Sequence, residues 1–102
     1  MTKTIDLSES EATIVRDILR AHLPPGTRAW VFGSRASASA RRYSDLDLAL
    51  EAEKPLSPDV LSDVREALSE SDLPYKVDMI DLRSIDAAFR AIIEPDMVAL
   101  PF

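Results

Sequence analysis

The sequence of 102 residues contains no cysteine, two glycines and one histidine. Without cysteine the chain forms neither disulfide bridges nor thiolate metal sites, and a reducing compartment is expected. No stretch is long and apolar enough to cross a bilayer, and the first 19 residues lack the basic region followed by an apolar run that marks a secretion signal. These absences predict a cytoplasmic protein with no membrane partner.

The charge balance is acidic, with 12 Lys and Arg against 18 Asp and Glu and a formal net charge of −6. This balance opposes the counterion release on which non-specific nucleic-acid binding depends, so a direct nucleic-acid partner is disfavoured. The length and the 46% hydrophobic content are those of one ordinary domain with one core. We therefore expect residues 1–102 to form a single domain.

Helical and strand patterns alternate along the chain. A capping box of Ser8 and Glu11 begins the first helical pattern, and Ser57 and Ser84 are placed to cap two more. The patterns predict helices over about 9–22, 58–69 and 85–94, a tight turn with a short helix over 33–40, and strands over 28–32, 45–51, 76–82 and 97–100. In the last helix an apolar face is expected from Ile85, Ala88, Phe89, Ile92 and Ile93. This order predicts an α/β (α+β) fold, a small mixed β-sheet with helices on one or both faces.

One of the two glycines, Gly33, stands between a predicted strand and the short helix, and Ser34 follows it. Glycine allows backbone amides to approach an anion closely at the start of a helix, and the Ser34 hydroxyl adds a donor. Gly33 and Ser34 are therefore candidates for holding a phosphate group.

Two aspartates, Asp45 and Asp47, are spaced so that a strand points both carboxylates to the same face. Like charges this close repel each other, and a divalent cation with its preference for oxygen ligands resolves the repulsion. Asp78, in the next predicted strand, is the candidate third carboxylate of a two-metal site and a candidate acceptor for the proton of an attacking hydroxyl. Asp81 has the opposite parity and is the weaker choice. The alternative for all of these is a solvated strand face.

The pattern of Gly33 and Ser34, then Asp45 and Asp47, and about thirty residues later Asp78 resembles the polymerase-beta nucleotidyltransferase superfamily. The stretches FGSRA, SDLDLAL and KVDMIDL are similar to its minimal nucleotidyltransferase branch, the MntA-like antitoxins. The resemblance implies the polymerase-beta-like fold, two Mg²⁺ ions held by the three aspartates, ATP held at the glycine-serine turn, and transfer of AMP with release of pyrophosphate.

Arg35 also matches this family's motif, and it is expected either to touch phosphate or to cap the sheet edge. The chain departs from the common GSRARG sequence at Ser37 and Ala38, which stand in place of the second arginine and the second glycine. Arg41 and Arg42, a little further on, could reach phosphate, meet an acidic partner or lie on a solvated loop.

The chain has no room for a second, acceptor-binding domain, so the acceptor is expected to bind an open site or to be a folded protein. The resemblance implies a HEPN toxin, a ribonuclease that is inactivated when AMP is added to a tyrosine hydroxyl, which makes this chain its antitoxin. Two alternatives stay open at this point. In the first alternative the chain is a binding module that neutralises the partner by contact. In the second it is one subunit of a small-molecule nucleotidyltransferase.

Overall fold

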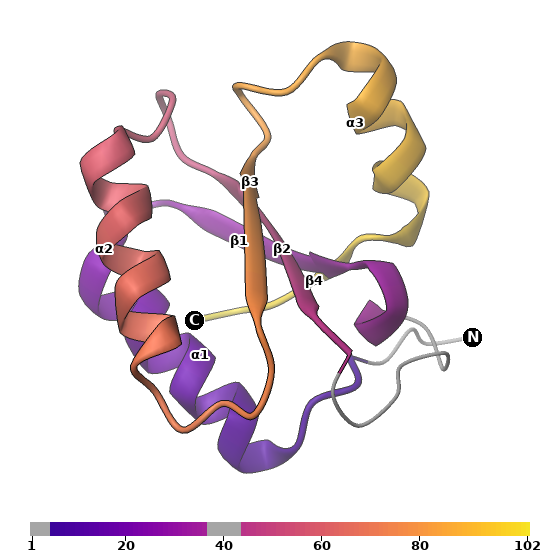
Figure 1. The fold of residues 1–102 in the computed structure, drawn as a ribbon. Coiled ribbons are helices and arrows are strands. Elements are labelled where there is room, and N and C mark those ends of the chain that lie inside the picture. The colour runs from indigo at the N-terminus through magenta and orange to yellow at the C-terminus, as the bar shows by residue number, and fades with distance from the viewer. Residues whose placement is uncertain (1–4, 37–43) are drawn as a thin grey trace.

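The computed structural model describes residues 5–36 and 44–102, and Figure 1 shows their arrangement. The elements in chain order are the helix α1 (Glu9–His22), the strand β1 (Arg28–Phe32), the 3-10 helix η1 (Gly33–Ala36), the strand β2 (Leu46–Glu51), the helix α2 (Pro58–Ser69), the strand β3 (Val77–Asp81), the helix α3 (Ala87–Ile93), the 3-10 helix η2 (Glu94–Asp96) and the strand β4 (Val98–Ala99). The predicted alternation of helices and strands is confirmed.

The four strands form one mixed sheet in the order β3-β2-β1-β4. β1 pairs antiparallel with β2 and with β4, whereas β2 and β3 run parallel. Two registers position the candidate site: Phe32 of β1 lies opposite Asp47, and Asp47 lies opposite Asp78 of β3. The glycine turn and two of the predicted carboxylates therefore meet at one end of the sheet.

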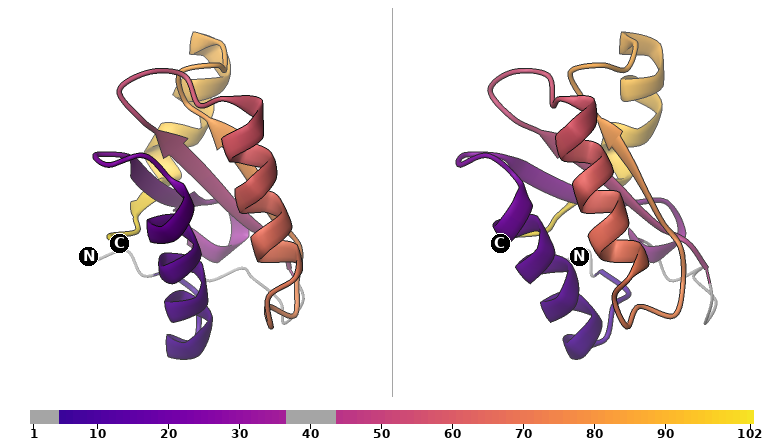
Figure 2. Two further views of the ribbon diagram at one scale, coloured as in Figure 1. Left: turned by 90° about the vertical axis from the view of Figure 1, so that its left-hand side faces the viewer. Right: turned by 60° about the vertical axis from the view of Figure 1, so that its left-hand side comes forward.

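The main core lies between the sheet and the helices α1 and α2, which lie side by side on one face (Figure 2). The strict alternation of β2 produces this face, because its leucines point into the core while the residues between them point the other way. The fully buried residues there include Leu46, Leu48, Leu50, Val15, Leu19 and Val64.

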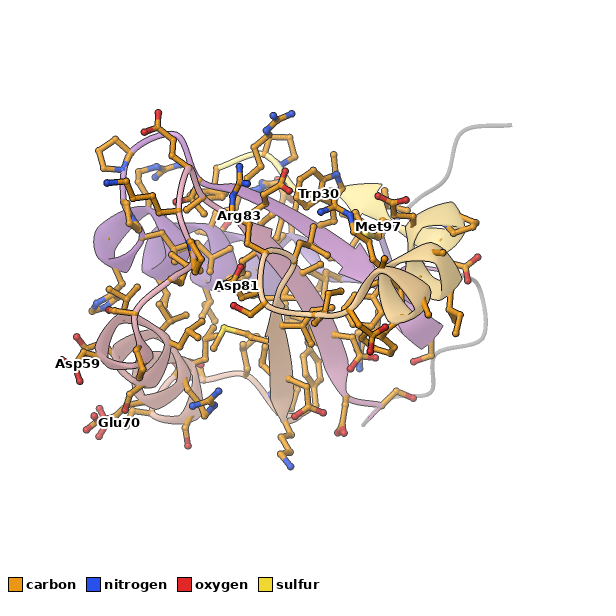
Figure 3. The ribbon with its side chains drawn as sticks, turned by 90° about the horizontal axis from the view of Figure 1, so that it is seen from above. Trp30, Asp59, Glu70, Asp81, Arg83 and Met97 are labelled. Carbon is orange, nitrogen blue, oxygen red and sulfur yellow. The ribbon has the colours of Figure 1, made fainter. Side chains whose placement is uncertain are left out.

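The opposite face of the sheet carries a smaller apolar cluster beneath α3. Its buried members are Ala49, Leu82 and Ile93, and Trp30 and Met97 pack against them (Figure 3). Asp47 and Ala49 share a face of β2, so the candidate carboxylates lie on this side of the sheet and not on the side of α1 and α2.

Two helix starts agree with the sequence patterns. At α1, Ser8 Oγ accepts a hydrogen bond from the Glu11 amide at 3.1 Å, and the Ser8 amide donates to Glu11 Oε1 at 3.0 Å. This is the predicted capping box. At α2, Ser57 Oγ accepts from the Val60 amide at 3.2 Å.

The third helix differs from the prediction. The helix begins at Ala87, and its cap is Asp86, whose Oδ1 accepts from the Phe89 amide at 2.7 Å. Ser84 is not the cap, because its hydroxyl donates to Asp81 Oδ2 at 3.2 Å. The expected apolar face is also wrong for most of its length: Ile92 is 70% exposed and Phe89 39% exposed, and Ile93 is the buried residue of this short helix.

No strand end differs from its predicted position by more than one residue. Asp45 directly precedes β2, and Lys76 directly precedes β3. Ser37, Ala38, Arg41 and Arg42 lie outside the described residues, as does the second half of the predicted short helix. Within residues 5–36 and 44–102, no helix combines the length and the apolar character needed to cross a membrane.

Candidate active site

The turn at Gly33 fits directly against Asp47. Gly33 has a φ of 73°, in the left-handed region that favours glycine. A Cβ added there would overlap Asp47 Oδ2 and would lie 3.4 Å from Asp47 Cγ. Glycine is thus required twice, by the backbone conformation and by the space that the carboxylate occupies. The two halves of the motif, predicted to act together, lie side by side.

Asp47 and Asp78 lie opposite each other on the parallel strands β2 and β3. Residues opposite each other on neighbouring strands point to the same face, so both carboxylates lie on the side of the sheet away from α1 and α2. Asp45 immediately precedes β2 and has the same parity as Asp47. The structure therefore brings all three predicted aspartates to the same end of the sheet.

The charges of these aspartates act on one another. Burial raises the pKa of the Asp47 carboxyl above its ordinary value, and the negative charges of Asp78 and Asp45 raise this pKa further. Such a cluster of carboxylates suits a hard divalent cation, which prefers oxygen ligands and removes the repulsion. Among the described residues, however, no three Asp, Glu or His side chains already stand close enough to form a complete metal site.

Asp78 is more accessible than Asp47, its partner across the two strands. Its side chain is 53% exposed, and its Oδ1 lies 3.9 Å from Lys76 Nζ in a surface ion pair. β3 is an edge strand. A hollow of about 490 Å³ beside α2 has Lys76 and Asp78 in its wall. A group that approaches from outside the sheet can therefore reach Asp78 without moving the core.

Asp81 has a structural role on the other side of the same strand. It is buried, and its carboxylate accepts hydrogen bonds from the Leu56 amide at 2.8 Å, the Arg83 amide at 3.0 Å and the Ser84 hydroxyl at 3.2 Å. Figure 3 shows Asp81 and Arg83 close together where β3 ends, at the opposite end of the strand from Asp78. These bonds join the loop before α2 to the turn after β3, which agrees with the preference for Asp78 over Asp81 as the site residue.

The two residues after Gly33 differ in their surroundings. Ser34 is partly buried in η1, next to the glycine turn. Arg35 is only 4% exposed, and its guanidinium donates to two backbone carbonyl groups, from Nε to Ser44 at 3.0 Å and from a terminal nitrogen to Asp6 at 3.0 Å. Contacts of this kind fit the capping role considered for Arg35.

Tyr75 is a site-forming residue that the sequence patterns did not single out. Its ring lies under the Arg35 guanidinium, with 3.8 Å between the guanidinium carbon and the ring centroid. Tyr75 comes three residues before Asp78, directly before the KVDMIDL stretch. The aromatic residue directly before this stretch was the one sign in the sequence that position 75 has a role. Its arginine partner is 40 positions away, so the sequence pattern could not identify the contact.

Comparison with known proteins identifies relatives over almost all of the chain. The family described as Polymerase beta, Nucleotidyltransferase matches residues 5–98. A protein from Haemophilus influenzae named Probable protein adenylyltransferase MntA is 42% identical over 96 residues, which are 94% of this chain and 83% of that protein.

Solved structures with a similar fold come from toxin-antitoxin complexes. A mutant of the MntA-HpeT complex matches with a TM-score of 0.75 at 23% identity, and a toxin-antitoxin complex with AMP-PNP matches with a TM-score of 0.71 at 25% identity; each match covers 88% of this chain and 72% of the other. A tri-AMPylated HEPN toxin of Shewanella oneidensis in complex with MNT antitoxin matches with a TM-score of 0.72 at 24% identity, over 93% of this chain and 72% of the other.

Proposed function

This chain belongs to the polymerase beta nucleotidyltransferase family, and we propose that it is a Mg²⁺-dependent protein adenylyltransferase that inactivates a HEPN toxin. In this proposal residues 1–102 act as one minimal nucleotidyltransferase domain and transfer AMP from ATP to a hydroxyl group of the toxin, a tyrosine hydroxyl by the family resemblance. The observation that carries the proposal is the placement of Asp47 between the Gly33 turn and Asp78. Because ATP is the donor, we place the reaction in the cytoplasm.

Each part of the site has a role in this reaction. The backbone at Gly33 and the Ser34 hydroxyl hold the triphosphate at the start of η1. Asp45, Asp47 and Asp78 are the residues that would hold Mg²⁺, two ions by the resemblance, which neutralises phosphate charge when bound. The oxygen donors and the raised pKa of Asp47, caused partly by its acidic neighbours, fit such an ion.

The bond changes follow from this arrangement. The acceptor oxygen attacks the α-phosphorus of ATP, the bond from that phosphorus to the β-phosphate oxygen breaks, and pyrophosphate leaves. The proton of the acceptor hydroxyl passes to an Asp78 oxygen, which is the exposed carboxylate on the edge strand.

Two observations support the proposal that the acceptor hydroxyl belongs to a protein. The relative from Haemophilus influenzae is named a probable protein adenylyltransferase, and a structural neighbour contains an AMPylated HEPN toxin together with its antitoxin. In addition, the Asp78 side chain is 53% exposed on the edge strand β3, where a segment of another folded protein can reach it.

Neutralisation of the partner by contact alone is the second candidate. It is favoured by the lack, among the described residues, of three acidic or histidine side chains gathered into a ready metal site. In this case the partner is bound and remains unmodified.

The test compares the wild-type protein with Asp45→Asn, using a HEPN toxin as the partner and ATP labelled at the α-phosphate. The proposal expects label on the partner with the wild type, and loss of both labelling and neutralisation with Asp45→Asn. Full neutralisation by Asp45→Asn would select the contact mechanism. Labelling of a small molecule in the absence of any protein partner would instead indicate a small-molecule nucleotidyltransferase subunit.

A further inference from the structure

Arg35 is a buried cation that contacts several segments of the site. Among the residues that the structure describes, its side chain donates hydrogen bonds to the backbone carbonyl groups of Ser44 and Asp6 and lies over the ring of Tyr75. The Asp6 amide in turn donates to the Arg35 carbonyl at 2.7 Å, so these two backbones are joined in both directions. A buried charge persists only when such partners compensate for its lost hydration.

The contacted residues adjoin the functional groups of the site. Ser44 directly precedes Asp45, Tyr75 comes three residues before Asp78, and Arg35 itself comes two residues after Gly33. We infer that Arg35 is a positioning residue, which holds the segments bearing Asp45 and Asp78 in a fixed relation to the glycine turn. The consequence of this positioning for AMP transfer rests on the proposed function.

The guanidinium group is suited to this role in a way that lysine is not. It is planar, so it can lie flat on the Tyr75 ring while its edge donates hydrogen bonds in fixed directions. A lysine ammonium is a point charge on a flexible stem and cannot keep the stack and both carbonyl contacts together. Arg35→Lys therefore keeps the positive charge and removes the combination of ring stacking and directed hydrogen bonds.

One hydrogen bond reports directly on this positioning. The Leu46 amide donates to the Lys76 carbonyl at 2.9 Å and joins the start of β2 to the start of β3. Leu46 follows Ser44 by two residues and Lys76 directly follows Tyr75, so this bond joins the two segments that the guanidinium contacts. At the opposite end of the same strand pair, the Leu82 amide donates to the Leu50 carbonyl at 2.8 Å, far along the sheet from Arg35.

The first arm of the test is amide hydrogen exchange of the full chain in Arg35→Lys. The inference expects protection of the Leu46 amide to fall by about tenfold or more while that of Leu82 changes less than about threefold, because the loosening is local. The matched control is Arg20→Lys on α1, whose arginine is exposed and paired with Asp17, and which is expected to change neither amide. Equal loss at both amides would overturn the inference, since it would show that Arg35 supports only the general stability of the fold.

The second arm is the kinetics of AMP transfer to the partner by the same variants. Displacement of the carboxylates by a fraction of an ångström is expected to lower kcat by about tenfold or more and to leave KM for ATP within about threefold. A tenfold rise in KM with kcat unchanged would overturn the inference and restore Arg35 as a phosphate ligand. If Arg35→Lys does not fold, Tyr75→Leu removes the stacking ring and carries both arms.

The two proposals fail in different ways. If the wild-type protein transfers no AMP, the proposed function is wrong, and the amide exchange still decides whether Arg35 positions this end of the sheet. If the wild type is active and both variants behave as it does in the two arms, the positioning inference alone is wrong.

Discussion

Gly33 lies directly against Asp47, and a carboxylate oxygen of Asp47 fills the space that the Cβ of any other residue at position 33 would need. The relationship joins two segments 14 positions apart, and it depends on the β1–β2 register that sets Phe32 opposite Asp47. In the proposed reaction one of these residues faces the triphosphate and the other faces the cation. Their contact therefore fixes how far apart the two ligands are held.

Gly33→Ala tests this contact. The substitution places an L side chain at a φ of 73° and displaces the Asp47 carboxylate. We expect a loss of about 1–3 kcal/mol in the free energy of unfolding from the backbone strain, and a fall in transfer rate of about a hundredfold from the displaced carboxylate. Urea unfolding and single-turnover transfer measure the two effects.

The other glycine provides the control. Gly26 has a φ of 84°, and a Cβ added to it meets no atom of the described residues within 4 Å. Gly26→Ala therefore has a similar backbone strain with no collision, and its folded form should transfer AMP at the wild-type rate. If Gly33→Ala is no less active than Gly26→Ala, the contact with Asp47 has no functional meaning.

Asp47→Asn should stabilise the fold while it removes activity. Since burial and the charges of Asp78 and Asp45 raise the pKa of Asp47, the folded state binds a proton at this carboxyl more tightly than the unfolded state does. Stability then falls as the pH rises from the ordinary carboxyl pKa through the raised value, and the full penalty applies above it. We therefore expect Asp47→Asn to raise the free energy of unfolding at pH 7.

The gain should disappear at a pH below the ordinary carboxyl pKa, where the wild-type Asp47 is protonated as well. Urea unfolding of both proteins at neutral and acid pH, without divalent cations, measures the difference. A gain that is equal at both pH values would show that the charge of Asp47 is not its cause.

Asp78 and Asp81 should respond to substitution in opposite ways. Asp81→Ala leaves the donors of Leu56, Arg83 and Ser84 without their acceptor, and we expect a cost of about 2–4 kcal/mol in stability with little change in transfer by the folded protein. Asp78→Asn, at a half-exposed position, should leave thermal stability almost unchanged and abolish transfer. Normal transfer by Asp78→Asn would show that this carboxylate is not in the site.

Tyr75 should titrate late. Burial, and next the negative charge of Glu11, raise the pKa of its hydroxyl to about 12. The folded state therefore holds this proton more tightly than the unfolded state, so stability is lost as the pH rises from 10 towards 12. Ultraviolet titration in a Tyr43→Phe background, where Tyr75 is the remaining tyrosine, measures the value directly. An ordinary value near 10 would contradict the burial of this ring.

The sequence patterns predicted those features that depend on local spacing. Alternation in DLDLALE separates the core leucines from the aspartates, and the capping box at Ser8 sets the start of α1. The roles of residues that bond to partners far away in the sequence could not be predicted from local spacing. Ser84 is a residue type that often caps helices, but its hydroxyl donates to Asp81. The Asp81 carboxylate also accepts a hydrogen bond from the Leu56 amide, 25 positions away.

Arg35 shows the same limit within the site. As part of the motif it is expected at a phosphate or at the sheet edge, and in the described residues it contacts three separate segments, at Asp6, Ser44 and Tyr75. The placement of Asp47 beside Gly33, in contrast, follows from an antiparallel register that the two strand patterns and the turn between them define. The motif thus predicted which residues gather at this end of the sheet, and the tertiary contacts determine what holds them in place.

In the proposed function, the site formed by the three aspartates at one end of the sheet transfers AMP to a partner protein. The most direct measurement is the intact mass of the partner after incubation with the wild-type protein, ATP and Mg²⁺, beside the same reaction with Asp47→Asn. The proposed function predicts a partner mass that rises by whole AMP units with the wild type alone. An unchanged mass in a complex that stays assembled, or the same rise with Asp47→Asn, would contradict it.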